Sequence, residues 1–200
     1  MNSGRVIGVT GTPGTGKKSV ASALADITKR DLLEINRFAI GLEGEESSAN
    51  GTVLVDRRVL RAKILRSRSG TSIISGHLLS YVFRKGELSF VAVLRCEPLE
   101  LRRRLEARNY SRAKVAANVE AELIGLVLDE AVETFGRATV HEYDTTHRTP
   151  VSVAALIARD LRSRKSRRKR WIDWTLGYDS AAKFRELILG EADRTGPAST

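Results

Sequence analysis

Residues 11–19 read Gly11-Thr12-Pro13-Gly14-Thr15-Gly16-Lys17-Lys18-Ser19. The glycines of this run let the backbone curl until several N–H groups point at one centre. The preceding apolar segment, Arg5 to Thr10, is typical of a buried parallel strand, and apolar residues recur at helical spacing from Lys17 to Thr28. A glycine-rich loop that joins a strand to a helix and ends in lysine predicts a P-loop NTPase with ATP as its ligand.

Each position of the loop has an expected role. Lys17 is a candidate catalytic residue because its ammonium group can reach the β- and γ-phosphates. A hydroxyl residue for Mg²⁺ usually follows this lysine. Here Lys18 follows, and Ser19 comes one place later, as in many nucleoside monophosphate kinases, so Ser19 is the candidate Mg²⁺ ligand, directly or through water. Lys18 either contacts phosphate or faces solvent. The expected ATP-binding residues of the loop are Gly11, Pro13, Gly14, Thr15, Gly16, Lys17, Lys18 and Ser19.

Strands and helices alternate along the rest of the chain. Short apolar runs predict further strands at residues 32–35, 71–75, 89–95 and 138–143. Helices are expected at residues 56–68, from Pro98, at residues 111–135 and at residues 149–162, and residues 41–50 read as a loop. This pattern predicts an α/β fold of the nucleoside-monophosphate-kinase type, with a parallel sheet of five strands flanked by helices.

Composition limits the classes of protein to which the chain can belong. The 200 residues favour one domain, and the single cysteine, Cys96, excludes an internal disulfide and a cysteine-based zinc site. No apolar run approaches the roughly 18 residues of a membrane span, and the N-terminus lacks signal-peptide features, so we expect a cytoplasmic protein without membrane contact. The net charge of +10 favours polyanionic partners.

A cluster of cations surrounds a predicted turn at Asn109-Tyr110. Arg104 and Arg108 are four residues apart and share a helix face, while Arg112 and Lys114 lie just beyond the turn. Such a cluster can close over a polyphosphate as a lid, in which Arg104 and Arg108 stabilise the transferring phosphoryl group. A solvated basic helix is the alternative.

Several motifs together resemble one family. They are VTGTPGTGK at residues 9–17, Glu34 to Asn36 (EIN), Ser75 to His77 (SGH), and the block from Leu101 to Ala131 that contains RNYSRAK. From Val6 to about Trp174 the chain resembles the adenylate kinase isoenzyme 6 family, also described as coilin-interacting nuclear ATPases or ribosome-assembly ATPases, with archaeal members.

The resemblance implies a function and a domain plan. The function is phosphoryl transfer from Mg·ATP to AMP, giving two ADP, together with ATPase activity. Residues 1–160 would form the kinase domain, with the lid around 104–118 and the acceptor-binding region around 36–68, and residues 161–200 would form a basic extension. A monomer is the default for such a kinase, and a nuclear location applies only in a eukaryote.

The chain departs from this family at one position. The family carries Asp-x-His after a strand, with the Asp ordering Mg²⁺ and water, whereas this chain has Ser75, and only His77 remains as a catalytic candidate. His77 is otherwise a structural histidine. Without this Asp, either ATP hydrolysis is in doubt or another carboxylate, such as Asp56, orders Mg²⁺ and water. The alternative role for Asp56 is that of a helix cap. Asn36 and Arg37 follow the second strand, where the acceptor binds, although Arg37 also fits a plain surface position.

Two further polar sites have open alternatives. Asn118 and Glu122 lie four residues apart, and by resemblance such positions hold the lid, whereas the alternative is an ordinary helix surface. Residues 144–147 (DTTH) follow the last strand, where P-loop kinases place a loop against the adenine, and a plain turn is the alternative.

Arg162 to Arg170 holds seven basic residues in nine. A run this dense favours polyanions, and the resemblance implies contact with a small-subunit ribosomal protein or pre-ribosomal RNA. Trp171 and Trp174 either stack on bases or pack on the domain, and their spacing of three favours packing. A second hypothesis for the whole chain is therefore an ATP-switched assembly factor of the small ribosomal subunit, with incidental kinase activity.

Overall fold

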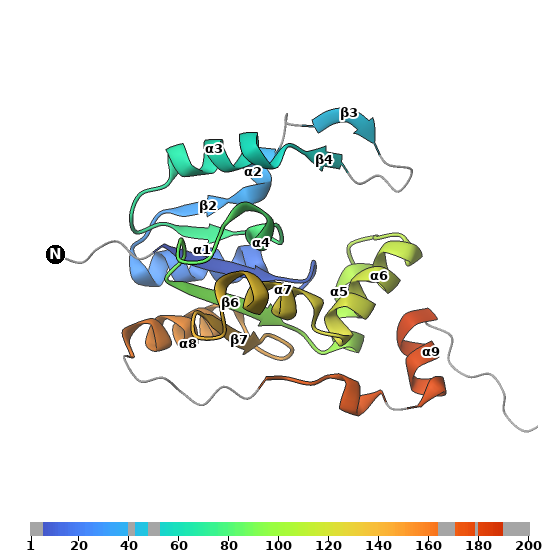
Figure 1. Ribbon diagram of the computed structural model, residues 1–200. Coiled ribbons are helices and arrows are strands. Elements are labelled where there is room, and N and C mark those ends of the chain that lie inside the picture. The colour runs from blue at the N-terminus through green and yellow to red at the C-terminus, as the bar shows by residue number, and fades with distance from the viewer. Residues whose placement is uncertain (1–5, 40–42, 48–52, 164–170, 179, 190–200) are drawn as a thin grey trace, which may run out of the picture.

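The computed structural model describes residues 6–39, 43–47, 53–163, 171–178 and 180–189. Its centre is a five-stranded parallel sheet with the strand order β2-β5-β1-β6-β7 (Figure 1). Ile7 of β1 stands in register with Ile73 of β5 on one side and with Phe90 of β6 on the other. The predicted parallel sheet of five strands is confirmed, with bounds β1 Ile7–Gly11, β2 Leu32–Glu34, β5 Ile73–Ser75, β6 Phe90–Arg95 and β7 Val140–Asp144.

Helices cover both faces of the sheet, which explains why β1, β5 and β6 are buried along their whole length. On one face α1 (Lys17–Thr28) packs against α8 (Pro150–Arg162), and Leu24 and Ile157 meet the strands there. On the other face lie α3 (Arg57–Ser67), α4 (Leu79–Val82) and α7 (Leu126–Phe135), which share a second apolar cluster. These two layers hold the carboxyl ends of the strands, and the loops that follow them, in place.

A third apolar cluster lies beyond the carboxyl ends of the strands. Leu101 and Leu105 of α5 (Pro98–Glu106) pack there against Val119 of α6 (Arg112–Leu123). Leu187 of α9 (Ala181–Leu189) closes this cluster and is 1% exposed. The C-terminal helix therefore packs against the predicted lid region (Figure 1).

Two predicted boundaries were wrong. The helix expected at residues 111–135 is two helices, because Gly125 takes φ 74° and ends the first before α7 begins. Part of the expected loop at residues 41–50 is a strand, since β3 (Glu43–Ser47) pairs antiparallel with β4 (Val53–Val55) after the short helix α2 (Ile35–Ala39). The described part of the chain contains no helix long and apolar enough to cross a membrane.

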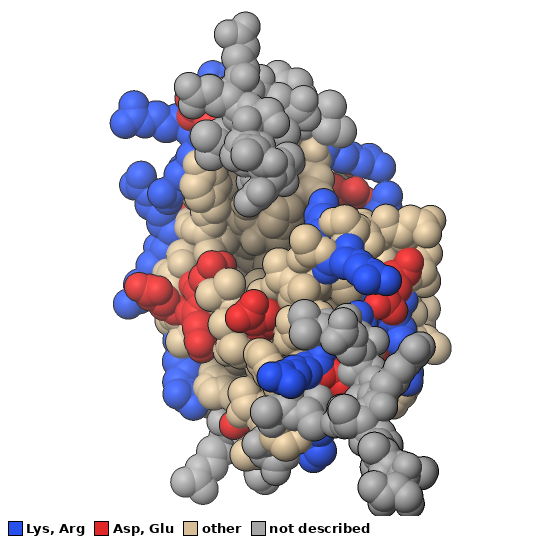
Figure 2. Space-filling view, turned by 90° about the vertical axis from the view of Figure 1, so that its right-hand side faces the viewer, with Lys and Arg blue, Asp and Glu red and all other residues tan. Residues whose placement is uncertain are grey.

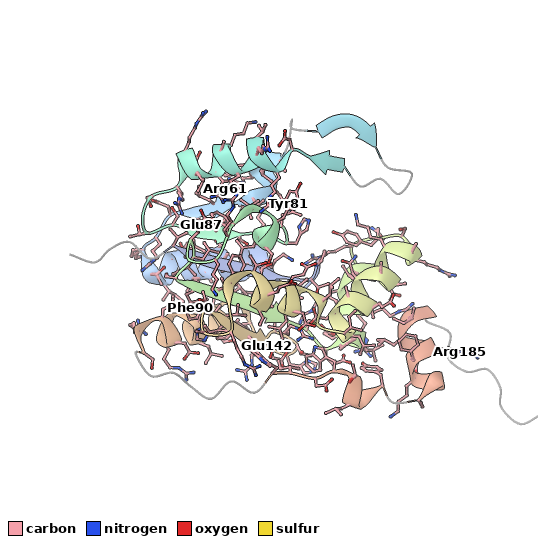
Figure 3. The ribbon with its side chains drawn as sticks, in the orientation of Figure 1. Arg61, Tyr81, Glu87, Phe90, Glu142 and Arg185 are labelled. Atoms are coloured by element: carbon pink, nitrogen blue, oxygen red, sulfur yellow. The ribbon has the colours of Figure 1, made fainter. Side chains whose placement is uncertain are left out.

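An ion pair fixes α3 against the loop after α4. Arg61 Nη1 lies 2.8 Å from Glu87 Oε2 and 2.7 Å from the carbonyl oxygen of Val82, and the two side chains point toward each other (Figure 3). A second bond joins the same guanidinium and carboxylate. The hydrogen bonds from Arg61 lower the pKa of Glu87 against the opposing effect of burial. The contact anchors the helix that belongs to the predicted acceptor-binding region.

The C-terminal segment packs on the kinase core. Trp171 contacts the cluster beneath α7, with Arg137 over its ring, and Trp174 contacts the cluster around α5 and α6. The packing predicted for both tryptophans is confirmed, although residues 171–174 are not helical and only a short 3-10 turn, η1 (Thr175–Gly177), follows. Most of the basic run, residues 164–170, lies outside the described residues.

The cap at the start of α3 gives a first testable prediction. The Asp56 carboxylate accepts hydrogen bonds from the backbone N–H groups of Arg58, at 2.7 Å, and Val59, at 3.4 Å. Asp56→Ala should lower the free energy of unfolding by about 1 kcal/mol, whereas Asp56→Asn should keep most of the stability, because asparagine is an equally good cap. Urea unfolding measures both variants. A loss of ATP turnover in Asp56→Ala at unchanged stability would instead favour the alternative role as a Mg²⁺-ordering acid.

Candidate nucleotide-binding site

The loop between β1 and α1 is shaped by three glycines with positive φ. Gly11, Gly14 and Gly16 have φ angles of 146°, 97° and 90°. A Cβ atom on Gly11 would lie 2.4 Å from the carbonyl oxygen of Leu94, and one on Gly14 would lie 2.6 Å from Leu101 Cδ1. These positions need glycine for space as well as for backbone conformation. The loop therefore curls tightly over the N-terminus of α1, whose free N–H groups favour anions.

Lys17 is folded back onto this loop. Its Nζ atom donates to the carbonyl oxygens of Gly11, at 2.7 Å, and Thr12, at 3.0 Å. Burial lowers the pKa of Lys17 to about 8, while the nearby Glu122 carboxylate raises this pKa and Arg108 lowers it. Part of the Lys17 surface is exposed, but its ammonium group is enclosed. An anion bound at the loop therefore strongly stabilises the charged form of Lys17.

A pocket of about 520 Å³ opens in front of the loop. Figure 2 looks onto this end of the molecule and shows a hollow with Lys and Arg side chains along its right-hand rim. Four separate segments contribute side chains to the pocket: the phosphate loop, the start of α2, the turn after β5, and the turn between α5 and α6. Its lining residues are Pro13, Gly14, Gly16, Lys17, Lys18, Ser19, Asn36, His77, Arg108, Tyr110 and Lys114.

The lid cations of the pocket stand on a tight turn. Asn109 takes φ 57°, a conformation that asparagine tolerates, and reverses the chain between α5 and α6. Arg108 and Lys114 are exposed on either side of this turn, and Lys114 Nζ lies 4.9 Å from the centroid of the Tyr110 ring. Among the residues that the structure describes, neither cation has a carboxylate within 4.0 Å. Both remain available to a phosphate.

Arg104 lies away from this pocket, so the structure corrects its expected place beside Arg108. Its Nη2 atom donates to the carbonyl oxygens of Thr145, at 2.9 Å, and Thr146, at 2.6 Å, and its Nε donates to Glu100 Oε1 at 2.9 Å. Because α5 ends at Glu106, Arg104 is on the helix while Arg108 lies in the turn that follows it, so the two side chains do not share a helix face. It is placed to hold residues 144–147, which also contact the phosphate loop because Thr145 Oγ1 lies 3.1 Å from the carbonyl oxygen of Thr15.

The acceptor side of the pocket is only partly as expected. Asn36 and His77 line it, and Gly76 brings β5 so close to α2 that a Cβ there would lie 2.8 Å from Ile35 Cβ. Partial desolvation in the concave mouth lowers the pKa of His77, and Lys17 and Lys114 lower it further. Arg37 does not line the pocket, and its Nε lies 3.6 Å from Glu34 Oε2.

The pocket lining offers few side-chain oxygen ligands to a magnesium ion. Ser19 supplies a hydroxyl oxygen there, whereas Lys18, beside it, reaches within 3.9 Å of Glu34 Oε2. No carboxylate lines the pocket in the part of the chain that is described, and Ser75 stays buried at the end of β5. This donor set fits an ion that arrives bound to phosphate oxygens, because Mg²⁺ commonly takes most of its ligands from substrate and water.

Glu122 contacts the phosphate loop, a position that the sequence did not settle. It is 1% exposed, and its Oε2 atom accepts a hydrogen bond of 2.5 Å from Thr12 Oγ1 in the phosphate loop. The sequence held one indication that Glu122 is buried, because this residue continues the apolar stripe of Val115 and Val119 at helical spacing. Asn118 instead donates to the carbonyl oxygen of Lys114 on its own helix, at 2.6 Å, as the helix-surface alternative expects.

Comparison with known proteins gives the same fold. A family model described as an AAA domain matches residues 7–125. The chain is 33% identical over 187 residues to a Thermococcus onnurineus protein named "Putative adenylate kinase", covering 93% of this chain and 99% of that one. A protein of the same name from Archaeoglobus fulgidus is 35% identical over 178 residues, covering 84% and 91%.

Solved structures share the architecture at low identity. TT1252 from Thermus thermophilus has a TM-score of 0.55 at 18% identity and covers 80% of this chain and 98% of that one. A shikimate kinase from Bacteroides thetaiotaomicron has a TM-score of 0.51 at 16% identity and covers 78% and 97%. At this identity the likeness supports the P-loop kinase fold alone.

Proposed function

This chain belongs to the AAA-domain family of P-loop proteins and is related along nearly its whole length to the proteins named "Putative adenylate kinase". From that premise we propose that it transfers the γ-phosphoryl group of ATP to AMP, giving two ADP. Nucleotide kinase chemistry follows the family, and AMP as the acceptor follows the names of the relatives. A slower transfer to water would accompany the reaction whenever the acceptor is missing.

The observation that carries this proposal is the composition of the pocket. The phosphate loop, Asn36 and His77 on the acceptor side, and Arg108 and Lys114 on the lid line one cavity of about 520 Å³. A nucleotide kinase needs these three parts at one place, because the donor phosphate, the acceptor phosphate and the stabilising cations must meet in line. A protein that only binds nucleotide has no need of the acceptor side.

Catalysis in this pocket consists of positioning and charge stabilisation. The N–H groups of the loop and Lys17 hold the β- and γ-phosphates, and Arg108 and Lys114 neutralise charge on the phosphoryl group during transfer. Mg²⁺ bound to the phosphates, with Ser19 as its protein ligand, supplies further charge neutralisation when present. Asn36 orients the acceptor, and His77, whose pKa is lowered by partial burial and by Lys17 and Lys114, can form a hydrogen bond at the acceptor side. Arg104 serves as a positioning residue for the loop at residues 144–147.

A panel of acceptors tests the proposal. The purified protein is incubated with Mg·[γ-³²P]ATP and, in separate reactions, AMP, CMP, GMP and UMP, and the labelled nucleotides are separated by chromatography. We expect label in ADP with AMP as the acceptor, and less or none with the other monophosphates. Label that appears only as free phosphate in every reaction would contradict a kinase function.

The lowered pKa of Lys17 predicts proton uptake on nucleotide binding. In the free protein, with the pKa of Lys17 at about 8, roughly half of the molecules carry a neutral Lys17 at pH 8. Bound phosphates favour the charged form and raise this pKa, so binding of ADP at pH 8 should take up about half a proton, and affinity should fall as the pH rises above 8. Calorimetry in buffers of different ionisation enthalpy measures the uptake, and Lys17→Met should remove it. Equal uptake in Lys17→Met would assign the proton to another group.

The assembly-factor hypothesis remains a second candidate because the pocket lining, within the described residues, contains no carboxylate. A kinase that lacks an acid to order Mg²⁺ and water is expected to turn over slowly, which suits an ATP-switched binding protein. The net charge of +10 favours a polyanionic partner for such a switch, such as pre-ribosomal RNA or the small-subunit ribosomal protein implied by the resemblance. In the labelling experiment this function predicts slow release of phosphate that does not depend on AMP.

A further inference from the structure

A buried carboxylate joins the phosphate loop to the C-terminal segment. Glu122 Oε2 accepts from Thr12 Oγ1 at 2.5 Å, while Glu122 Oε1 accepts from Arg95 Nε at 2.7 Å, from the backbone N–H of Cys96 at 3.0 Å and from Trp174 Nε1 at 3.3 Å. Glu122 is 1% exposed, so none of these bonds is shared with bulk water. Three segments far apart in the sequence therefore meet at one side chain.

Thr12 is the point at which this network enters the loop. Its carbonyl oxygen accepts hydrogen bonds from the Thr15 N–H at 3.1 Å, from Thr15 Oγ1 at 2.9 Å and from Lys17 Nζ at 3.0 Å. The hydroxyl that bonds to Glu122 thus belongs to the residue that organises the turn of the loop. A phosphate bound at the loop competes for Lys17, and when Lys17 turns toward it, the Thr12 carbonyl loses a charged donor.

Further bonds fix the C-terminal segment to the same structure. Arg95 Nη1 donates to Glu142 Oε1 at 2.6 Å, and the backbone N–H of Ile172 donates to Glu142 Oε2 at 2.7 Å. Glu142 lies on β7, on the side of the sheet along which the C-terminal segment passes (Figure 3), and Tyr178 further along donates to the Glu97 carboxylate. The segment from residue 171 to residue 178 is therefore held at both ends by hydrogen bonds to Glu142 and Glu97.

We propose that Glu122 is a positioning residue that couples occupancy of the phosphate loop to the C-terminal segment through Thr12 and Trp174. Buried charged networks have few arrangements that satisfy every group, so a shift of Thr12 is compensated at the other donors of Glu122 and is not absorbed locally. By linkage, contacts that hold or release Trp174 change nucleotide affinity by the same factor by which nucleotide changes the docking of the segment. This inference rests only on the nucleotide-binding part of the proposed function.

Tryptophan fluorescence tests the coupling directly, because Trp171 and Trp174 are the two tryptophans of the chain. In Trp171→Phe the emission comes from Trp174 alone, and titration with ADP should change its intensity or wavelength. Thr12→Val in this background keeps the shape of the side chain but lacks the hydroxyl, and should lose the change, whereas Thr12→Ser should retain it. The Trp174 signal would contradict the coupling if it stayed constant while calorimetry showed ADP bound, or if it changed equally in Thr12→Val.

A double-mutant cycle on ADP affinity gives the second test. Thr12→Val and Trp174→Phe should each weaken ADP binding. For Thr12→Val the expected loss of affinity is about fivefold, which corresponds to one hydrogen bond. The double variant should bind ADP no more weakly than the single variant with the larger loss. Trp171→Phe is the matched control, since it makes the same substitution in the same segment without touching Glu122, and it should leave affinity unchanged. Additive losses, or an equal loss in Trp171→Phe, would overturn the coupling.

The same samples separate this inference from the proposed function. If the protein binds ADP but does not transfer a phosphoryl group to AMP, the kinase function is contradicted and the mutant cycle still tests the coupling. If the wild-type protein does not bind ADP, both the kinase function and the coupling are contradicted. The cycle uses variants of Thr12 and Trp174 because Glu122 Oε1 keeps two other donors when Trp174 is replaced, whereas Glu122→Gln would disturb the buried Arg95 and its fold-stabilising contacts.

Discussion

Arg108→Ala is expected to lower the rate of phosphoryl transfer by about 10³-fold while the dissociation constant of ATP changes by less than about tenfold. Arg108 stands on the lid turn beside the pocket and, among the described residues, has no carboxylate within 4.0 Å. A cation in that position interacts most strongly with the charge that develops on the phosphoryl group during transfer, so its loss raises the barrier more than it weakens the ground state. Single-turnover kinetics combined with ATP-binding calorimetry separates the two effects.

Arg103→Ala is the matched control for this experiment. Arg103 is on α5, just before the turn that carries Arg108, is 67% exposed and pairs with Glu100 at 3.9 Å, outside the pocket. Removal of its charge should change neither rate nor affinity appreciably, because surface pairs of this kind contribute little. If Arg108→Ala instead weakens ATP binding and leaves the single-turnover rate unchanged, the lid arginine only binds nucleotide.

Lys17→Ala is expected to reduce ATP turnover by at least about 10²- to 10³-fold without unfolding the protein. The enclosed ammonium group of Lys17 lies on the phosphate loop, bonded to the carbonyl oxygens of Gly11 and Thr12, and can turn from them to the β- and γ-phosphates of a bound nucleotide. Removing it also relieves a desolvated charge, since burial lowers the pKa of Lys17 to about 8. Thermal unfolding should therefore show unchanged or slightly increased stability alongside the loss of activity.

Lys18→Ala provides the contrast within the same loop. Lys18 is 76% exposed and faces Glu34, so its removal should lower the rate by less than about tenfold. Equal losses in the two variants would mean that the loop needs only its net charge. Normal turnover by a folded Lys17→Ala protein would contradict the assigned role of the phosphate loop.

The sequence predicted those features that depend on local pattern. The glycine spacing at Gly11, Gly14 and Gly16 identified the loop, and the structure shows why, because two of these positions have no room for a Cβ atom. Continuous apolar runs identified all five strands of the parallel sheet, and the Asp56 cap marked the start of α3 correctly. Each of these features involves residues close together in the chain, where periodicity and capping preferences act directly.

Features that depend on tertiary contacts were predicted less well. Helical spacing grouped Arg104 with Arg108, but it did not show that α5 ends at Glu106, which leaves Arg108 in the turn at the pocket while Arg104 on the helix reaches the loop at residues 144–147. Gly125 was embedded in an apolar helical pattern, and only its left-handed conformation reveals the break. Arg37 followed the right strand but pairs with Glu34, which the linear motif did not indicate.

The role of Glu122 shows the same limit most clearly. Its partners Thr12, Arg95 and Trp174 are separated from it by 110, 27 and 52 residues, so no local pattern could bring them together. A carboxylate on the buried stripe of a helix was the one available signal, because such a group is rarely buried without partners. For the C-terminal segment the spacing of Trp171 and Trp174 predicted packing on the domain, but the partners in α5, α6 and β7 emerged only from the fold.

The most direct test of the central claim measures ADP and free phosphate produced from Mg·ATP by one purified sample, with and without AMP. The account predicts that AMP drives the formation of two ADP for each ATP consumed, with little free phosphate, and that Arg108→Ala loses this reaction while still binding ATP. Slow hydrolysis of ATP that is the same with and without AMP would contradict the kinase function.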